Sequence, residues 1–166
     1  MGSGAEPQVR PSWRFVLSRP AHFMAFGFGS GLSPKAPGTA GTLAAFLPYW
    51  LLAPWLGRGA FTLVLLAAFA VGVRWCGKTG EALGVDDYGG IVWDEIVAFM
   101  LVLLWIPQTA PWFGAAFLLF RLLDIWKPFP IRYLERRLKG GFGVMLDDLL
   151  AAGYTLAIIH GLLWLR

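Results

Sequence analysis

Residues 91–106 read IVWDEIVAFMLVLLWI, an apolar run interrupted only by the adjacent acids Asp94 and Glu95. A run of this length and composition predicts a helix that is buried in protein or surrounded by lipid. Acids near a helix N-terminus are favoured by the helix dipole, so a capping role for one of them is the simplest explanation. Two adjacent carboxylates at the edge of an apolar helix are nevertheless costly, and together they indicate a bound cation.

Four further apolar stretches accompany this one: Thr42–Leu56, Ala60–Trp75, Trp112–Trp126 and Leu149–Leu165. Each of the five is about 15–17 residues long, near the lower edge of the roughly 17–25 residues that a spanning helix needs. Pro48 and Pro54 interrupt the first stretch, which we expect to be bent or re-entrant. The expected fold is all-α, a polytopic membrane helical bundle of about five apolar helices with cytoplasmic Gly-rich and charged loops.

The composition of the chain favours lipid as its surroundings. Apolar residues make up 57% of the 166 residues and charged residues 14%, and the mean hydropathy is +0.62. Soluble domains average roughly 45–50% apolar and about 25% charged residues. Nine Trp and 13 Phe fit the membrane interface, although a soluble protein with a large aromatic core is the alternative. We therefore expect residues 20–166 to form a single membrane-embedded catalytic domain, preceded by a disordered cytoplasmic tail at 1–19.

The charged residues gather between alternate apolar stretches. They lie before the first stretch, in the loop Arg74–Gly90 and in the loop Lys127–Met145. By the positive-inside rule, these segments face the cytoplasm, which predicts a multi-pass protein of the bacterial inner membrane with its active site on the cytoplasmic side. The net charge of +4 suits anionic lipid headgroups, whereas the scattered Lys and Arg residues argue against a nucleic-acid partner.

A Gly-rich segment precedes the first apolar stretch and reads GFGSGLSPKAPGTAGT over residues 27–42. Glycine lets several backbone N–H groups converge on an anion, and hydroxyl and ammonium groups add donors. This pattern predicts a phosphate site with contributions from Ser33, Lys35, Gly38 and Thr39. Glycine used for tight helix packing, or a flexible interfacial loop, remains the alternative.

Two later clusters combine acids with cations. The segment 121–132, RLLDIWKPFPIR, places Arg121, Asp124 and Lys127 at intervals of three along a helix, and the segment 140–148, GGFGVMLDD, predicts a Gly-rich turn that leads into the last helix. An ion pair within the helix explains Arg121 and Asp124 but leaves Lys127 and Arg132 without a role. We expect these cations to neutralise the charge on phosphoryl oxygens.

The acids of these clusters predict one metal centre, because all of them lie at the expected cytoplasmic end of a helix. Carboxylates are ligands for hard cations, and a chain with only two His residues does not favour zinc. Mg²⁺ is therefore the expected cofactor, with candidate ligands Asp94, Glu95, Asp124, Asp147 and Asp148. Asp86 and Asp87 belong to none of the clusters, and we expect both to be dispensable. Cys76 is the single Cys, which excludes an internal disulfide.

The four clusters together resemble the phosphatidylglycerophosphatase A family. Members of that family are similar in a Leu-Ser-Pro…Pro-Gly-Thr-x-Gly loop, an Ile-Val-Trp-Asp-Glu helix start, an Arg-x-x-Asp-x-x-Lys-Pro-x-Pro-Ile segment and a Gly-Gly-x-Gly-x-Met-x-Asp-Asp turn. The resemblance implies Mg²⁺-dependent hydrolysis of the phospholipid substrate phosphatidylglycerophosphate to phosphatidylglycerol and inorganic phosphate. For this reaction we expect catalytic roles for a set of charged residues in the clusters: Asp94, Glu95, Arg121, Asp124, Lys127 and Asp148.

Two other classes of function stay open at this point. An enzyme similar to the CDP-alcohol phosphotransferases also uses acids at a membrane face, although the acids here lack the expected spacing along consecutive helical turns. A small membrane ion transporter or channel is the alternative without catalysis, because acids within membranes often mark ion paths. Against a transporter, the acids lie at helix ends and none lies near the middle of an apolar stretch.

Overall fold

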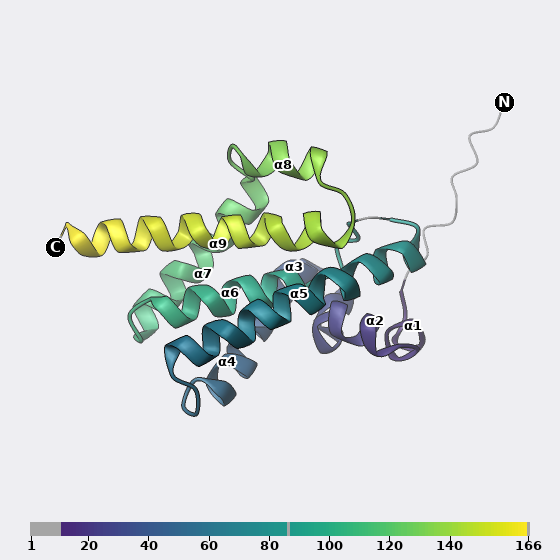
Figure 1. The fold of residues 1–166 in the computed structure, drawn as a ribbon, viewed down its shortest axis with the longest axis horizontal. Helices are drawn as coiled ribbons and strands as arrows, with labels where there is room; N and C mark the ends of the chain where they lie inside the picture. Colours follow the sequence, from purple (N-terminus) through teal and green to yellow (C-terminus); the bar gives the residue numbers. More distant parts are fainter. Residues whose placement is uncertain (1–10, 86, 166) are drawn as a thin grey trace.

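The computed structural model describes residues 11–85 and 87–165, and every regular element within these ranges is a helix (Figure 1). The elements in chain order are α1 Trp13–Leu17, α2 Pro20–Ala25, the 3₁₀ helix η1 Gly27–Leu32, α3 Pro37–Ala44, α4 Phe46–Leu52, α5 Arg58–Leu83, α6 Trp93–Trp105, α7 Ala110–Trp126, α8 Ile131–Arg137 and α9 Gly140–Trp164. The predicted all-α fold is thus confirmed for the described residues.

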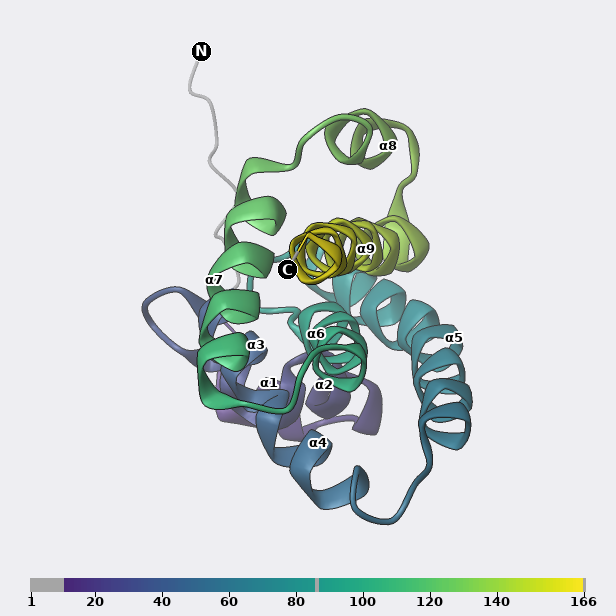
Figure 2. The same cartoon turned by 90° about the vertical axis from the view of Figure 1, so that its left-hand side faces the viewer.

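The apolar helix α6 forms the centre of the molecule. Figure 2 shows it end-on, with α5, α7 and α9 arranged around it. Its side chains are buried along almost the whole helix, and Phe99 and Leu103 are fully enclosed. Successive long helices run in opposite directions, so the C-terminal ends of α5 and α7 lie at the same end of the molecule as the N-terminal ends of α6 and α9. This arrangement brings the charged segments of the sequence together.

The apolar stretch Thr42–Leu56 contains the one predicted irregularity, and the structure has a break there. Helix α3 ends at Ala44 and α4 begins at Phe46, and α4 itself ends at Leu52, two residues before Pro54. A proline removes a backbone donor and disfavours helical geometry in the residue before it. The stretch therefore forms two short helices instead of one span.

The segment Gly140–Asp148 differs from the expected turn, because residues from Gly140 onward already form the first turns of α9. A Cβ atom added at Gly141 would overlap the carbonyl of Val73 and would lie 2.6 Å from the backbone nitrogen of Gly77, both on α5. The glycine therefore allows α9 and α5 to pack backbone to backbone. This packing outweighs the low helix propensity of glycine, on which the prediction of a turn depended.

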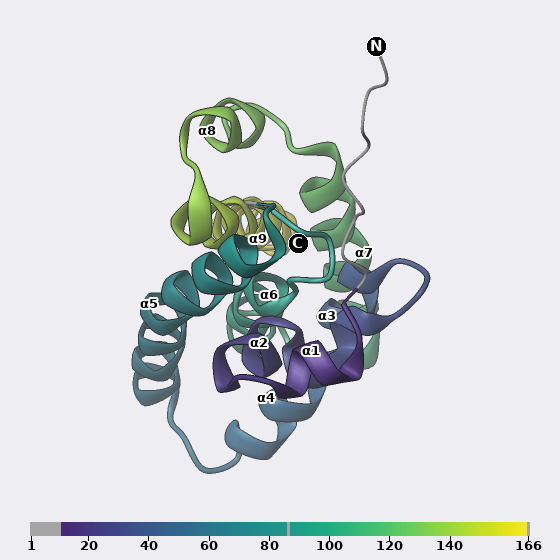
Figure 3. The ribbon, with the colours of Figure 1, turned by 90° about the vertical axis from the view of Figure 1, so that its right-hand side faces the viewer.

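The N-terminal helices α1 and α2 cover one end of the bundle (Figure 3). Part of the expected disordered tail is helical in α1, where Val16 is fully buried in a small cluster with Phe26 and Leu83; residues 1–10 lie outside the described ranges. His22 of α2 shares a 2.9 Å hydrogen bond with Thr79 of α5 and is 2% exposed. These contacts fix α2 against the end of α5.

Two of the described helices, α5 and α9, are long and apolar enough to cross a membrane. Helix α6 has 13 residues and is roughly 20 Å long at 1.5 Å per residue, which is short for a span. The five expected spans are therefore not confirmed. Large apolar side chains are nevertheless exposed on α4, α5, α7 and α9, including Leu47, Trp50, Leu63, Leu118 and Leu162. Soluble monomers rarely expose so much apolar surface, so the protein is membrane-associated.

Candidate active site

A cavity of about 330 Å³ opens where the ends of α3, α6, α7 and α9 meet. Most of its polar lining consists of charged side chains from three helices and from the two connections that follow α5 and α7. These are Asp87 from the loop between α5 and α6, Asp94 and Glu95 from α6, Arg121 and Asp124 from α7, Lys127 after α7, and Asp147 and Asp148 from α9. The fold thus brings together, from distant parts of the sequence, all five acids that were predicted as metal ligands.

The acids of α6 are held in place by Trp93, the first residue of the helix. Its indole Nε1 donates a 3.2 Å hydrogen bond to the Ala68 carbonyl on α5, and its ring packs edge-on against Trp75 at 5.4 Å. A Cβ at Gly72 would lie 2.6 Å from the indole, so glycine at that position makes room for the ring. Because Trp93 precedes the acids directly, this anchor sets the direction in which Asp94 and Glu95 leave the helix.

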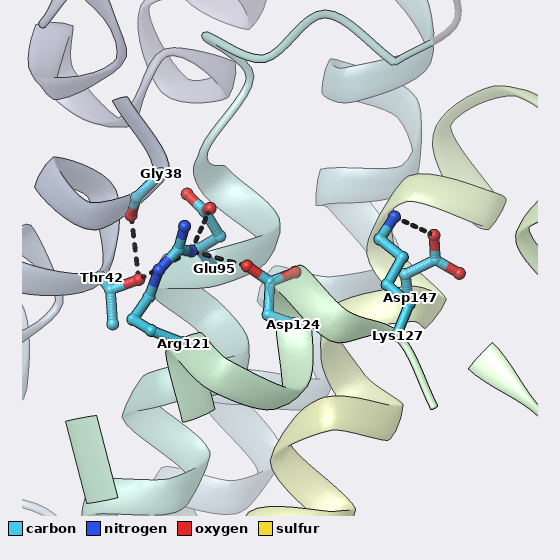
Figure 4. A network of polar contacts seen from close by, with 7 residues as sticks. All are labelled: Gly38, Thr42, Glu95, Arg121, Asp124, Lys127 and Asp147. Atoms are coloured by element: carbon cyan, nitrogen blue, oxygen red, sulfur yellow. Dashed lines mark hydrogen bonds and ion pairs between the residues drawn. The ribbon is translucent and has the colours of Figure 1, made fainter. Parts of the chain in front are cut away.

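Arg121 connects α6, α7 and α3 across the cavity wall, as Figure 4 shows. Its Nη1 lies 2.6 Å from Oε1 of Glu95 and 2.7 Å from Oδ2 of Asp124, and it reaches the Thr42 hydroxyl at 3.5 Å. The predicted pair between Arg121 and Asp124 is therefore present as one part of a larger network. The side chains of Arg121, Glu95 and Asp124 are 14%, 11% and 13% exposed, so little solvent screens these charges.

Lys127 connects the other side of the cavity. Its ammonium group lies 2.7 Å from Oε1 of Glu135 on α8 and 3.1 Å from Oδ2 of Asp147 on α9. Burial alone would lower the pKa of Lys127, but the hydrogen bonds to these two acids raise it above its usual value, so the charge is retained. The backbone of Lys127 has φ of +48°, the left-handed conformation with which many helices end, and its N–H donates a hydrogen bond to the Leu123 carbonyl at the end of α7.

Several carboxylate oxygens in the cavity are buried without a hydrogen-bond partner among the described residues. They are Oδ1 of Asp94, Oε2 of Glu95, Oδ1 of Asp147 and Oδ2 of Asp148. Buried polar atoms are normally paired, so unpaired anionic oxygens in a cluster indicate a missing positive partner. Burial, together with the charges of Glu95 and Asp87, raises the pKa of Asp94 well above its usual range, and burial raises that of Glu95 to about 7 despite Arg121.

This donor set fits a hard divalent cation in its chemistry. No three acidic, His or Cys side chains in the described part of the chain are already arranged around one point as metal ligands. Mg²⁺ commonly binds through only one or two carboxylates, with water and substrate phosphate completing its coordination, so it does not require a complete protein cage. The unpaired oxygens of Asp94 and Asp148 are suited to such a partial site.

The Gly-rich segment contributes less to the cavity than its sequence predicts. Gly38 lines the cavity, and a Cβ there would overlap Oε1 of Glu95 and lie 2.9 Å from Nη2 of Arg121. The side chain of Lys35 is exposed, and the Ser33 hydroxyl donates a hydrogen bond to the Lys35 carbonyl. Ser33, Lys35 and Thr39 are not among the residues that line the cavity. The other glycines, such as Gly31 against the Gly90 carbonyl, allow close packing, which was the alternative explanation.

Arg132 lies beside the cavity without lining it. It is exposed, its Nη2 donates a 2.9 Å hydrogen bond to the Trp126 carbonyl, and it belongs to a neighbouring hollow. Two acids outside the four sequence clusters lie at or next to the site: Asp87 lines the cavity, and Glu135 contacts Lys127. The only signal for Asp87 was its place in a short charged loop next to the N-terminus of the acidic helix, and nothing in the sequence paired Glu135 with Lys127.

Asp87 belongs to none of the four sequence clusters, yet it lines the cavity together with the predicted ligands. Desolvation of its carboxyl group raises the pKa of Asp87, although part of the side chain reaches solvent. We therefore expect Asp87→Asn to lower kcat/KM by roughly 10-fold, the effect of about 1.4 kcal/mol of lost charge interaction. Glu81→Gln on the exposed surface of α5 is the matched control, and equal rates for the two variants would contradict this role. Asp86 lies outside the described residues.

Comparison with known proteins identifies the family. The phosphatidylglycerophosphatase A family profile matches residues 23–163 of this chain, a range that contains every residue of the cavity. The chain belongs to the phosphatidylglycerophosphatase A family. It is 43% identical over 148 residues to phosphatidylglycerophosphatase A of Escherichia coli strain K12, covering 89% of this chain and 86% of the relative. It is 44% identical over 153 residues to the protein of the same name from Haemophilus influenzae, covering 92% and 94%.

A third relative is named for another lipid phosphate. A Bacteroides thetaiotaomicron protein, provisionally named a phosphatidylinositol-3-phosphatase, is 38% identical over 161 residues, covering 93% of this chain and 97% of the relative. No solved structure matches this chain. All three relatives are named as enzymes that remove a phosphate group from a phospholipid. Membership of the phosphatidylglycerophosphatase A family makes this chain a phosphatase that acts in lipid metabolism.

Proposed function

We propose that this chain hydrolyses the terminal phosphate of phosphatidylglycerophosphate in a Mg²⁺-dependent reaction, giving phosphatidylglycerol and inorganic phosphate. The observation that carries the proposal is the set of unpaired carboxylate oxygens that lies beside Arg121 and Lys127 in one cavity. Acids alone would repel a phosphate, and cations alone would bind it without activating water. A cavity with both can hold a metal ion and a phosphoryl group next to each other.

Asp94 and Asp148 are the residues that would hold the cation, with Asp124 and Asp147 as their neighbours. When bound, Mg²⁺ supplies Lewis-acid stabilisation of the charge on the phosphoryl oxygens. The cation also removes the electrostatic cost of burying the acids, because it gives the unpaired oxygens of Asp94 and Asp148 a positive partner.

Arg121 and Lys127 bind the phosphoryl oxygens from opposite walls of the cavity. Nη1 of Arg121 is held by Glu95 and Asp124, while Nη2 lies beside Gly38 and faces the space that the missing Cβ leaves. Because both cations are fixed by acids before substrate arrives, little reorganisation is needed during the reaction. The carboxylate of Glu95, whose Oε2 has no hydrogen-bond partner among the described residues, would accept the proton of the attacking water.

The charged end of the bundle faces the cytoplasm in this proposal. Helices α5 and α9 cross the membrane, with their apolar surfaces exposed to lipid. Helix α7 lies beside them and exposes Leu118 and Leu122 along its side. The cavity then lies near the headgroups, where the phosphate of a phospholipid would be found, and the charge asymmetry of the loops sets the orientation.

Release of inorganic phosphate from phosphatidylglycerophosphate by the purified protein in detergent tests this function. Wild-type protein should convert the lipid to phosphatidylglycerol, and Asp94→Asn should fail to do so. A transporter would instead move ions across liposomes without changing the lipid. Phosphatidylglycerophosphate that stays intact in excess Mg²⁺ would exclude the proposed activity.

A further inference from the structure

A second hollow of about 530 Å³ lies directly beside the active-site cavity. We call it the aromatic hollow; its walls include Trp126, Phe129, Tyr133, Arg132 and Arg136. Lys127 lines both the cavity and the aromatic hollow. In Figure 2 the chain leaves the end of α7 and leads to α8, which lies above α9. The lining residues of the hollow come from the end of α7, this connection and α8. The two spaces therefore share one wall.

The lining of the aromatic hollow combines cations with exposed aromatic rings. Trp126 is 63% exposed and Phe129 81% exposed, and the guanidinium groups of Arg132 and Arg136 line the same space. The bond from Arg132 to the Trp126 carbonyl uses one of five guanidinium N–H donors and orients the group. Aromatic rings and Arg residues of this kind are typical of the region where lipid headgroups meet acyl chains.

An apolar stripe on α7 leads to the aromatic hollow. Leu118, Leu122 and Ile125 are 69%, 59% and 70% exposed, and their spacing of four and three residues places them on one side of the helix. The stripe ends at Ile125, one residue before Trp126, which lines the hollow. A molecule bound there thus meets cations at one end and a continuous apolar surface at the other.

We propose that the aromatic hollow binds the phosphodiester of the same phospholipid molecule whose terminal phosphate lies in the cavity. This inference rests on the proposed function. The substrate has a phosphomonoester and a phosphodiester separated by a glycerol unit, and the chain has two adjacent cationic spaces with Lys127 between them. Arg132 and Arg136 bind the phosphodiester, and the acyl chains follow the stripe on α7. The hollow thereby selects lipids that carry both phosphates.

Product inhibition separates the two spaces, because each product carries one of the two phosphates. Phosphatidylglycerol retains the phosphodiester, and inorganic phosphate is the former monoester. We expect Arg136→Gln and Arg132→Gln each to raise KM for phosphatidylglycerophosphate and Ki for phosphatidylglycerol by roughly 10-fold, because each change removes a hydrogen bond from a charged donor to the phosphodiester. Ki for inorganic phosphate should change less than twofold. Arg58→Gln is the matched control, because the guanidinium of Arg58 stacks on the Trp105 ring away from the hollow.

The measurements use the full chain in detergent micelles without other anionic lipid. Arg132→Lys should recover part of the loss, because it restores the charge. An unchanged Ki for phosphatidylglycerol in Arg136→Gln, or an equal rise in Ki for inorganic phosphate, overturns the proposal. Activation or non-competitive inhibition by phosphatidylglycerol also overturns it, because the hollow would then bind a separate lipid. Failure of the wild-type protein to release phosphate is a different result and contradicts the proposed function itself.

Discussion

Asp124→Asn is expected to reduce kcat by on the order of 10²-fold or more while the protein still folds and inserts. Asparagine has nearly the same volume as aspartate, so packing at the end of α7 is retained. The change removes a negative charge from the centre of the cavity, where Oδ2 of Asp124 accepts a 2.7 Å hydrogen bond from Arg121. Phosphate release from phosphatidylglycerophosphate measures the effect, and thermal denaturation in detergent measures folding.

A purely structural role for Asp124 gives a different result. Loss of this carboxylate leaves Arg121 paired with Glu95, so a structural role predicts a lower folding free energy with a nearly unchanged rate. Glu81→Gln, an exposed acid-to-amide change on α5, controls for general effects of lost charge. Wild-type turnover in Asp124→Asn would rule out a part for this carboxylate in the reaction.

Arg121→Met is expected to have the largest effect on stability. It leaves Glu95 and Asp124 without a positive partner, although their side chains are only 11% and 13% exposed. Removing one member of a buried ion pair typically costs about 3–5 kcal/mol, which should lower the thermal midpoint by roughly 10 °C. Activity should disappear as well, because the cation that binds the phosphoryl group is lost.

Arg121→Lys separates the two roles of this residue. A single nitrogen, Nη1, contacts both carboxylates, so an ammonium group can take its place and recover most of the stability. Nη2, which lies beside Gly38, has no equivalent in lysine. We expect a thermal midpoint near that of the wild type with kcat still lowered by on the order of 10²-fold. Full activity in Arg121→Lys would show that the guanidinium has no role beyond its charge.

The long apolar helices could be predicted because their sequences leave few alternatives. The stretch Ile91–Ile106 corresponds to α6 at Trp93–Trp105, and Trp112–Trp126 corresponds to the greater part of α7. The outer helices were predicted too short. Helix α5 extends to Leu83 and α9 begins at Gly140, through residues whose composition is polar or Gly-rich. Tertiary contacts between α5 and α9 decide the length of these helices, and the local sequence pattern carries no information about such contacts.

The site could be predicted in part, because carboxylates at the ends of apolar helices are costly and therefore informative. Arg121, Lys127 and the five predicted acids all line the cavity. The contributions of Glu135 and Asp87 depend on how the connections fold, and a connection such as 127–130 has no periodic pattern. The positive φ of Lys127, which turns the chain at the end of α7, is equally invisible in the sequence.

We infer that the carboxylates of the cavity hold a divalent cation for hydrolysis of a lipid phosphate. The most direct test measures phosphate release from phosphatidylglycerophosphate by one preparation of purified protein, first with excess chelator and then during titration with Mg²⁺. The account predicts no release with chelator and recovery that saturates with Mg²⁺, at a much higher concentration for Asp148→Asn than for the wild type. Full activity in excess chelator would contradict the account.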